Sequence, residues 1–424
     1  MTPEELAEVR GLLEDFAAEV FEPLVRVDQR AKGQTYLRGL LLDGARKSMQ
    51  PMAERLGVDH QGLQQFVSSS TWDVTAVRSR IAAKAVEVIE PVAWVIDDTG
   101  FPKVGTASPG VARQYSGTLG KVGNCQIGVS VHAVTDTASC PLDWRLLLPA
   151  GWDPAAFETG ASADLAEADR RQKAEAIRLR RSRAGIPEAV GHRPKRQLAL
   201  DMLEELERWG QRPPAVAADA GYGNNADLRD ALSQRGLEWI MQVESDLTAH
   251  PAEAVPQQRE YSGLGPRGKP RYRGTPTSLR SHALDAGREA IQHVRWREGS
   301  RDQLTSSFLA LRVRPAGRRA TSRLAEDGSL PEQWLLADWP EEADEPVKYW
   351  LSNLPVDMPL PDLVRLAKIR WRIEHDYREL KTALGLDHFE GRTWTGWHRH
   401  VTLVTAAHLF RTLLRANPKA RGAA

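Results

Sequence analysis

The sequence is poor in cysteine and has no long apolar segment. Only Cys125 and Cys140 occur in 424 residues, which is too few for a disulfide framework, and they lack the spacing of a metal site. No uninterrupted apolar stretch approaches the roughly 20 residues that a membrane helix requires, and the N-terminus has no signal-peptide pattern. The sequence therefore predicts a protein of the cytoplasm with no membrane partner.

An excess of charge of one sign is also absent. The 57 Lys and Arg residues are balanced by 56 Asp and Glu residues, which gives a formal net charge of +1. Bulk charge therefore does not indicate a nucleic-acid partner. The first 19 residues are acidic, however, whereas segments 170–183 and 267–273 are basic, which would suit a polyanion-binding surface. Most charged segments of this kind are simply solvated.

Hydrophobic periodicity divides the chain into four parts and predicts the α/β class. Apolar residues at three- and four-residue intervals predict a helical N-terminal domain over residues 1–88. Residues 89–245 alternate between strand-like and helix-like segments, which predicts a mixed sheet that opens with an antiparallel meander. Residues 246–356 are predicted to form a β-rich insertion, and residues 357–424 return to long helices.

One segment of the N-terminal part has the outline of a helix-turn-helix. Residues 48–58 predict a helix that ends in a Gly turn, and residues 59–67 predict a second helix. In such a motif the second helix presents polar side chains to base edges, and Gln61 and Gln64 are the candidates here. A plain helical hairpin explains the same pattern equally well.

Two aspartates end strand-like segments of the central part. Asp98 follows the run 92–96 and Asp219 follows the run 215–218. Carboxylates at the C-terminal edge of a sheet point into the crevice where α/β folds bind ligands. Asp also caps helices and starts turns, so either residue alone has an equally good structural explanation.

A third acid lies in a long helix predicted over residues 362–383. Arg370, Glu374 and Lys381 are separated by four and seven residues, which places them on one face of that helix. A row of surface salt bridges would give the same spacing. Together with Asp98 and Asp219, however, Glu374 completes a set of three carboxylates that can hold two divalent cations over a phosphodiester.

The sequence blocks around these acids are Ile96-Asp97-Asp98-Thr99-Gly100-Phe101-Pro102-Lys103, Gly110-Val111-Ala112-Arg113-Gln114-Tyr115, Ala218-Asp219-Ala220-Gly221-Tyr222-Gly223 and Trp371-Arg372-Ile373-Glu374. They resemble those of bacterial insertion-sequence transposases of the DDE superfamily, in the branch with a Tyr-Arg-Glu-Lys signature around the last acid. The resemblance runs in the right order from about residue 40 to 412. The signature's Tyr falls on Ala367, which is a departure from the pattern.

The resemblance implies an RNase H-like mixed-sheet catalytic core, interrupted by the β-rich insertion and preceded by a helical N-terminal DNA-binding domain. It implies a DNA transposase that cuts the ends of an insertion sequence and joins them to target DNA, as a homodimer on its double-stranded DNA in the bacterial cytoplasm, associated with the nucleoid. Two Mg²⁺ or Mn²⁺ ions per active site would be bound by Asp98, Asp219 and Glu374, with Arg370 and Lys381 in the Arg and Lys positions. The family pattern favours Asp98 over Asp97, and adjacent strand residues face opposite sides.

Further DNA contacts are expected around the crevice and in the insertion, from Lys103, Arg113, Tyr115, Lys195 and Trp296. Trp296 would stack on an unpaired base, although a core tryptophan of the β-rich part is the simpler explanation. His398 and His400 lack a partner at metal-ligand spacing and are expected to be structural or to contact DNA.

Two other functions stay open. A domesticated, transposase-derived DNA-binding protein would keep the fold without transposition, and the intact set of three acids argues against it. A metal-independent hydrolase with paired carboxylates, such as a glycosidase, would explain neither Arg370 nor Lys381. Dependence on divalent metal ions separates the hydrolase from the transposase.

Overall fold

The computed structural model describes residues 2–158, 166–258, 270–298, 303–317, 325 and 327–416. The chain folds into two compact units. The first unit contains residues 1–91, 96–212 and 372–424, and the second contains residues 92–95 and 213–371. Each unit combines helices with strands, so the predicted α/β class is confirmed in its coarse form.

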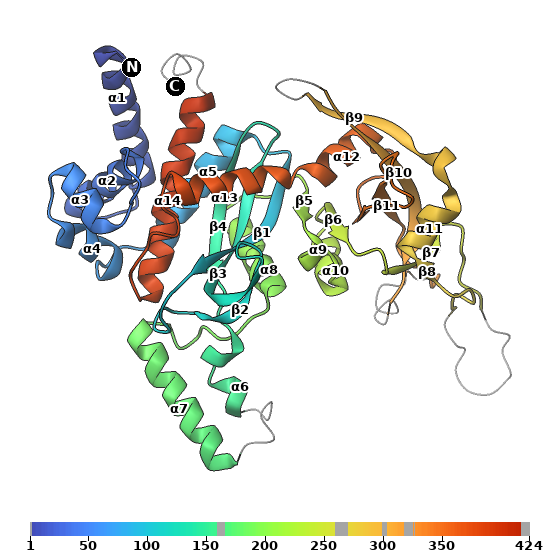
Figure 1. Cartoon of the computed structure of the whole chain (residues 1–424), viewed down its shortest axis with the longest axis horizontal. Coiled ribbons are helices and arrows are strands. Elements are labelled where there is room, and N and C mark those ends of the chain that lie inside the picture. The colour runs from blue at the N-terminus through green and yellow to red at the C-terminus, as the bar shows by residue number, and fades with distance from the viewer. Residues whose placement is uncertain are drawn as a thin grey trace. The chain divides into compact units, whose positions relative to one another are not determined.

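Five helices open the first unit (Figure 1), in agreement with the predicted helical N-terminal part: α1 (Pro3–Val20), α2 (Val27–Leu41), α3 (Met49–Leu56), α4 (His60–Ser68) and α5 (Val74–Ile89). Their starts follow from capping residues. Thr2 and Glu5 form a capping box on α1, and Asp59 and Asp73 cap α4 and α5, which satisfies backbone N–H groups that a helix leaves unpaired. The buried helix α14 (Trp394–Ala416) packs against α2, α4 and α5.

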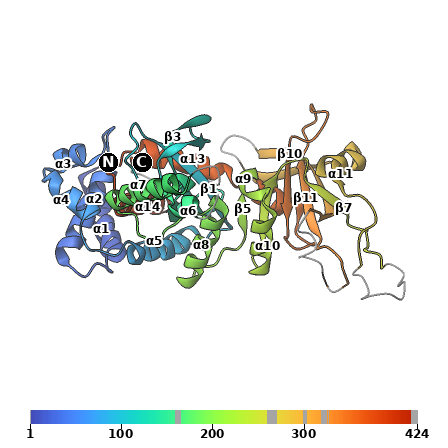
Figure 2. The same cartoon turned by 90° about the horizontal axis from the view of Figure 1, so that it is seen from below.

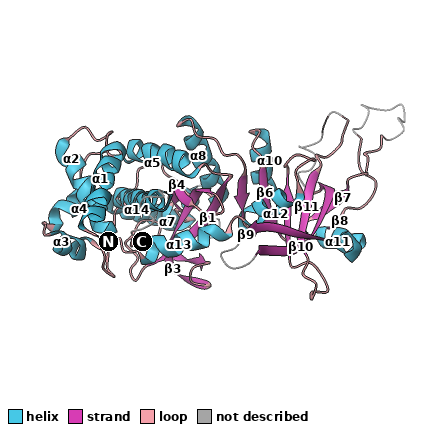
Figure 3. Ribbon diagram, turned by 90° about the horizontal axis from the view of Figure 1, so that it is seen from above, coloured by secondary structure: helices cyan, strands magenta, loops and turns pink. Residues whose placement is uncertain are grey.

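The strands of the first unit are β1 (Ala93–Pro102), β2 (Ala112–Ser116), β3 (Lys121–Val134) and β4 (Ser139–Leu146). Strand β3 pairs antiparallel with both β2 and β4, which confirms the antiparallel meander, and β1 lies next to β3 in the sheet. Two longer helices, α7 (Glu167–Ala184) and α8 (Lys195–Arg208), follow the short η1 (Ala150–Trp152) and α6 (Ala155–Glu158). Figures 2 and 3 show α8 and the later helix α13 (Trp371–Thr382) on opposite sides of β1.

The second unit continues from the first residues of β1, where the Trp94 N–H donates to the Ala215 carbonyl. Strands β5 (Val216–Ala218) and β6 (Trp239–Val243) are parallel. Antiparallel strands follow in the order β12 (Lys348–Ser352), β11 (Gln333–Asp338), β10 (Gln303–Pro315), β7 (Thr248–Pro251) and β8 (Thr277–Ser278), and β9 (Gln292–Glu298) also pairs with β10. The helices are α9 (Ala220–Gly223), α10 (Ala226–Gln234), α11 (Leu279–Ala286), η2 (Arg288–Ala290) and α12 (Leu360–Lys368).

The long helix predicted over residues 362–383 is wrong, because the chain forms two helices, α12 and α13, with a turn at residues 369 and 370. The two halves bury their apolar faces in different places. Helix α12 packs on β9 and β6 of the second unit, whereas α13 is hydrogen-bonded to Ser130 and Ser139 of the first unit. Tertiary packing therefore overrides a locally continuous helical pattern.

Candidate active site

Asp98 lies within β1, and its predicted place at the end of a strand is wrong, because β1 continues to Pro102 and Thr99 and Phe101 after it are buried. Trp94, Val95 and Ile96 before it are fully buried, as expected for an apolar run in a central strand. Asp97 is only 7% exposed, and its carboxylate accepts a hydrogen bond of 2.8 Å from the Asp98 N–H. Asp98 itself is half-buried. Of the two neighbouring acids, Asp98 is therefore the more accessible to a ligand.

The carboxylate of Asp98 already contacts a cation. Lys195, the first residue of α8, places its Nζ atom 2.9 Å from each of the two carboxylate oxygens of Asp98. The Lys195 side chain is 37% exposed and the Asp98 side chain is 18% exposed. Lys195 was predicted from the sequence to contact DNA. In the structure it forms an ion pair with Asp98, the first of the three candidate acids.

Asp219 follows β5 in the second unit and caps the short helix α9, where its side chain accepts a hydrogen bond from the Tyr222 N–H at 3.4 Å. Glycine is needed in this turn. A Cβ atom on Gly223 would lie 2.0 Å from the Gln242 carbonyl oxygen, and one on Gly221 would lie 3.1 Å from Asp219 Oδ1. The backbone therefore packs tightly around a half-buried carboxylate.

Glu374 lies on the exposed side of α13 in the first unit. Ile373 and Leu380 on the other side of this helix are fully buried. Lys381 follows Glu374 by seven residues, so these two side chains share one helix face, as the sequence predicted. Arg370 does not belong to that face, because it lies in the turn before α13, and its predicted place on the helix is wrong.

Lys381 connects the face of Glu374 to the strand of Asp98. Its Nζ atom donates to the Gly100 carbonyl oxygen at 2.9 Å and to Thr118 Oγ1 at 3.3 Å. Gly100 lies two residues after Asp98 on β1. Burial lowers the pKa of Lys381 below its usual value. The signature lysine thus links α13, which carries Glu374, to β1, which carries Asp98.

Ala367 and Tyr377 show how the chain departs from the family signature. Ala367, at the position of the signature Tyr, is buried in α12. The Tyr377 hydroxyl is hydrogen-bonded to Ser130 Oγ at 2.8 Å. Burial raises the pKa of Tyr377 well above its usual value, and the charges of Asp97 and Asp98 raise it further. The Tyr377 hydroxyl is therefore within electrostatic range of both acids of β1.

The donor chemistry of Asp98, Asp219 and Glu374 fits a hard divalent cation, since Mg²⁺ prefers carboxylate oxygens. The bidentate contact between Asp98 and the Lys195 ammonium shows that this carboxylate accepts a cation at both oxygens. Over the described ranges, no three His, Cys, Asp or Glu side chains already form a group that could hold a metal ion. Asp98 and Glu374 belong to the first unit and Asp219 to the second.

Three predicted DNA contacts follow Asp98 along the chain. Arg113 and Tyr115 lie on β2 and are exposed, with Tyr115 at 62%. Lys103 differs from them, because its Nζ atom donates to the Phe389 carbonyl oxygen at 2.9 Å and burial lowers its pKa. Arg113 and Tyr115 therefore have side chains available at the surface, whereas Lys103 is engaged within the first unit.

Helices α3 and α4 have the geometry that the sequence predicted, with Gly57 in the left-handed region at φ 66° between them. Gln61 and Gln64 of α4 are exposed, while Leu63 and Phe66 on the other face are buried. Gln64 also lines a cavity of about 520 Å³. This outline suits both a helix-turn-helix and a helical hairpin.

Two predicted contacts belong to the second unit. Trp296 lies on β9, half-buried, and its indole N–H donates to Ser306 Oγ at 3.2 Å. Of the basic segment 267–273, residues 267–269 lie outside the described residues. Trp296 therefore has a partner within its own sheet, as a structural tryptophan would.

His398 and His400 are buried on α14. Burial lowers the pKa of His398 to about 3 and that of His400 to about 4. His400 accepts a hydrogen bond from the Tyr36 hydroxyl at Nδ1 and donates from Nε2 to the Gly385 carbonyl oxygen, at 2.9 and 3.0 Å. A neutral ring satisfies both bonds. The structural interpretation of these histidines therefore agrees with their contacts.

Sequence reasoning missed a buried polar cluster behind Glu374, which we call the α13 anchor: His132, Ser139, Asp376 and Tyr377, with Ser130. An acid two residues after Glu374 looks like one more surface charge in a charged helix. The only signal that could have found it is the period of α13, since Asp376 falls between the apolar positions Ile373 and Leu380.

A family model and a related transposase agree with the sequence blocks. The sequence model of a family described as DDE superfamily endonuclease matches residues 19–303, well over half of the chain. A probable transposase for insertion sequence element IS701 from Microchaete diplosiphon is 22% identical over 357 residues, which cover 83% of this chain and 74% of that protein. A cryo-EM structure of a piggyBac transposase synaptic complex with hairpin DNA has a TM-score of 0.38 and 10% identity, over 94% of this chain and 68% of that chain. The resemblance to insertion-sequence transposases is thereby confirmed, and the chain belongs to the DDE superfamily of endonucleases.

Proposed function

We propose that this chain is a DNA transposase, which cuts DNA at the ends of an insertion sequence and joins those ends to target DNA. Membership of the DDE superfamily and the similarity to a probable insertion-sequence transposase support this proposal. The observation that carries it is the link from Lys381 to Gly100, because it ties the exposed face of Glu374 to the strand of Asp98. The antiparallel meander followed by helix, strand and helix supports an RNase H-like catalytic core.

In this proposal Asp98, Asp219 and Glu374 hold two Mg²⁺ or Mn²⁺ ions. Two such ions activate the attacking oxygen and stabilise the leaving oxygen of a phosphodiester. The chain's own residues fix the geometry: Lys381 holds α13 against β1, and Arg370 would offer its planar guanidinium to a flanking phosphate. Lys195 holds the Asp98 carboxylate in one orientation, and Asp98 would offer these oxygens to an ion.

The same set of residues can serve both reactions. When water attacks, one P–O bond of the element end breaks and a 3′-hydroxyl is left. When this hydroxyl attacks a target phosphodiester, one P–O bond forms and one breaks, and the target strand leaves with its own 3′-hydroxyl. Only the attacking oxygen differs between the two steps, so one site can catalyse both.

The DNA partner would be held outside this site. In the first unit the candidates are Gln61, Gln64, Arg113 and Tyr115, which are exposed, and Lys103. Trp296 is the candidate in the second unit. Arg and Lys contacts to phosphates would position the duplex, and the amides of α4 would read bases. A homodimer on its DNA would bring two element ends together.

The test replaces each acid by its neutral isostere, in Asp98→Asn, Asp219→Asn and Glu374→Gln. Each variant should lose more than about a hundredfold of Mg²⁺-dependent cleavage of an end-bearing duplex, since even residues behind metal ligands cost 10–100-fold. The thermal unfolding midpoint and DNA affinity should stay close to the wild-type values, because the shape of each side chain is kept. Chelation by EDTA should stop the wild-type reaction.

The matched control is Asp97→Asn. Asp97 is buried and accepts from the backbone, a bond that Asn can still accept, so cleavage should fall far less than in Asp98→Asn. Equal losses at both positions would show that Asp98 is not the acid that faces the ions. A wild-type protein that binds end DNA and never cuts it with Mg²⁺ or Mn²⁺ would favour the DNA-binding alternative.

A further inference from the structure

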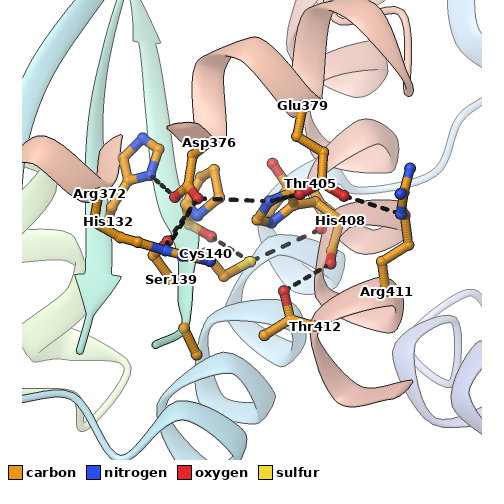
Figure 4. Close-up of polar contacts among 12 residues, drawn as sticks. His132, Ser139, Cys140, Arg372, Asp376, Glu379, Thr405, His408, Arg411 and Thr412 are labelled. Carbon is orange, nitrogen blue, oxygen red and sulfur yellow. Dashed lines mark hydrogen bonds and ion pairs between the residues drawn. The ribbon is translucent and has the colours of Figure 1, made fainter. Parts of the chain in front are cut away.

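Asp376 is a carboxylate on α13 with no exposed surface. Its Oδ1 atom accepts a hydrogen bond of 2.6 Å from Ser139 Oγ, and its Oδ2 atom lies 3.2 Å from His132 Nδ1. Ser139 in turn accepts a hydrogen bond of 2.9 Å from Arg372 Nε. These partners come from β3, β4 and α13 itself (Figure 4). The α13 anchor thus joins one face of the helix to two strands.

The anchor continues through a second residue of α13. The Tyr377 hydroxyl lies 2.8 Å from Ser130 Oγ, which lies 3.0 Å from His132 Nε2. Because a carboxylate only accepts, His132 donates to Asp376 from Nδ1. The Nε2 atom of the same ring is hydrogen-bonded to Ser130, and Ser130 is hydrogen-bonded to Tyr377. One connected set of hydrogen bonds therefore runs from Asp376 through β3 and back to Tyr377 on the same helix.

The burial of Asp376 makes this geometry stringent. Asp376 has no exposed surface, so water cannot replace the hydrogen bonds that its two carboxylate oxygens make with Ser139 and His132. A buried polar group that loses its partner carries the full cost of desolvation, so a rotation of α13 that separated Asp376 from Ser139 and His132 would be opposed. The anchor fixes the rotation of the helix about its axis.

That rotation decides where Glu374 points. Residues of an α-helix follow one another at about 100°, so Glu374, two positions before Asp376, lies on the opposite side. It is exposed, as this geometry requires. The link from Lys381 to Gly100 holds the same outward face against β1. The helix is thus held from both sides, by Lys381 on one and by Asp376 on the other.

We infer that Asp376 is a positioning residue of the metal site: through Ser139 and His132 it sets the direction of Glu374 and, with it, the affinity of the site for divalent cations. This inference rests on the proposed role of Glu374 as a metal ligand. Asp376 touches neither metal nor DNA in it.

A second buried acid on the same helix provides a matched control. Glu379 is 8% exposed and is paired with Arg411 at 2.9 Å and with Arg415, both on α14. Figure 4 shows His408 between the carboxylates of Asp376 and Glu379. Glu379 thus holds α13 to another helix rather than to the strands. Its loss should destabilise the fold without turning Glu374.

The experiment measures Mn²⁺ binding to the full-length, DNA-free protein by electron paramagnetic resonance. We expect Asp376→Asn to weaken Mn²⁺ binding by about tenfold, the lower end of the range for residues that support metal ligands. Glu379→Gln should leave the Kd for Mn²⁺ within about twofold of wild type, even when its unfolding midpoint falls as far as that of Asp376→Asn. Ser139→Ala, which keeps the charge and removes one bond, should show a smaller loss in the same direction.

The outcomes separate this inference from the proposed function. If Glu374→Gln weakens Mn²⁺ binding while Asp376→Asn and Ser139→Ala do not, or if Glu379→Gln weakens it equally, Asp376 has no positioning role and the proposed function stands. If Glu374→Gln itself changes neither Mn²⁺ binding nor cleavage, the proposed function fails first. Should Asp376→Asn not fold, Ser139→Ala decides the question by the same criterion.

Discussion

Glu374 and Asp376 are two residues apart on α13, and their surroundings are opposite. Glu374 is exposed and shares its face with Lys381. Asp376 is buried among Ser139, His132 and His408. Both faces of the helix carry acids, but a ligand from solvent can reach only the outward acid, because the inward acid has no exposed surface.

This difference separates two tasks that a charged helix can perform. A buried charge must be paired, since removing its partner costs about 3–5 kcal/mol, so inward acids are restricted to holding the helix. An exposed acid has no such restriction and can accept a metal ion. The same division applies to Asp97 and Asp98 on β1, of which the buried one is bonded to the backbone. In this unit, each of these two candidate ligands lies one or two residues from a buried acid that is hydrogen-bonded within the fold.

The largest effect expected outside the metal site is on the pH dependence of stability, and it comes from the buried His400, which should have no catalytic role. The pKa of His400 is lowered from 6.5 to about 4, so the folded state binds fewer protons than the unfolded state between these values. Its contribution to stability is present above pH 6.5 and is lost as the pH falls toward 4. At about 1.4 kcal/mol per pH unit, the total is roughly 3 kcal/mol.

His400→Gln should therefore flatten the fall in unfolding free energy between pH 6.5 and 4, measured by urea denaturation. The exposed His375 offers a control, and His375→Gln should leave the slope unchanged. A wild-type slope retained in His400→Gln would show that this histidine titrates normally.

The sequence predicted the local elements well, because their signals are short. The two helices predicted over residues 48–58 and 59–67 agree closely with α3 and α4, residues 49–56 and 60–68. Apolar periodicity and caps also placed the helices of residues 1–88. The antiparallel meander was predicted from the strand-like segments at the start of residues 89–245, although β2, which pairs with β3 in it, was not predicted as a strand. These features depend on residues within a few positions of one another.

The parts that failed depend on contacts between distant residues. The turn at Arg370 separates halves that pack on different units, and no Gly or Pro marks it. Lys195 lies 97 positions after Asp98 and bonds to it. Asp376 receives its hydrogen bond from Ser139, 237 positions earlier. A one-dimensional pattern shows that a polar residue is present, but it does not show which distant residue is its partner.

A smaller effect is expected on the outward face of α4. If this helix reads bases, replacing Gln61 and Gln64 together by Ala should reduce the preference for the end sequence over a scrambled duplex by about tenfold, since one base-edge contact is worth roughly 1–3 kcal/mol. Fluorescence anisotropy with the full-length protein measures it. Added salt should weaken binding to both duplexes, because phosphate contacts release counterions.

The control for α4 is Gln50→Ala on the neighbouring helix α3, where the amide donates to Glu54 Oε1 within that helix. It should leave the sequence preference unchanged. Equal preference in the wild type and in the double variant would make α3 and α4 a structural hairpin. Base recognition would then be sought in the basic segment 267–273.

The smallest effect concerns Lys195, for which two roles can be tested against each other: competition with a metal ion at Asp98 and contact with DNA. If its ammonium stands where a metal ion binds to Asp98, Lys195→Met removes a competitor and Mn²⁺ should bind more tightly. The gain is limited to about fivefold, because partly exposed ion pairs contribute at most about 1 kcal/mol.

If Lys195 instead serves as the DNA contact that the sequence predicted, Lys195→Met should leave the Mn²⁺ affinity unchanged. It should then weaken DNA binding for all sequences alike and lower the salt dependence by about one ion. Measuring the Mn²⁺ affinity and the DNA affinity of Lys195→Met distinguishes a lysine that competes with the metal ion from a lysine that binds DNA.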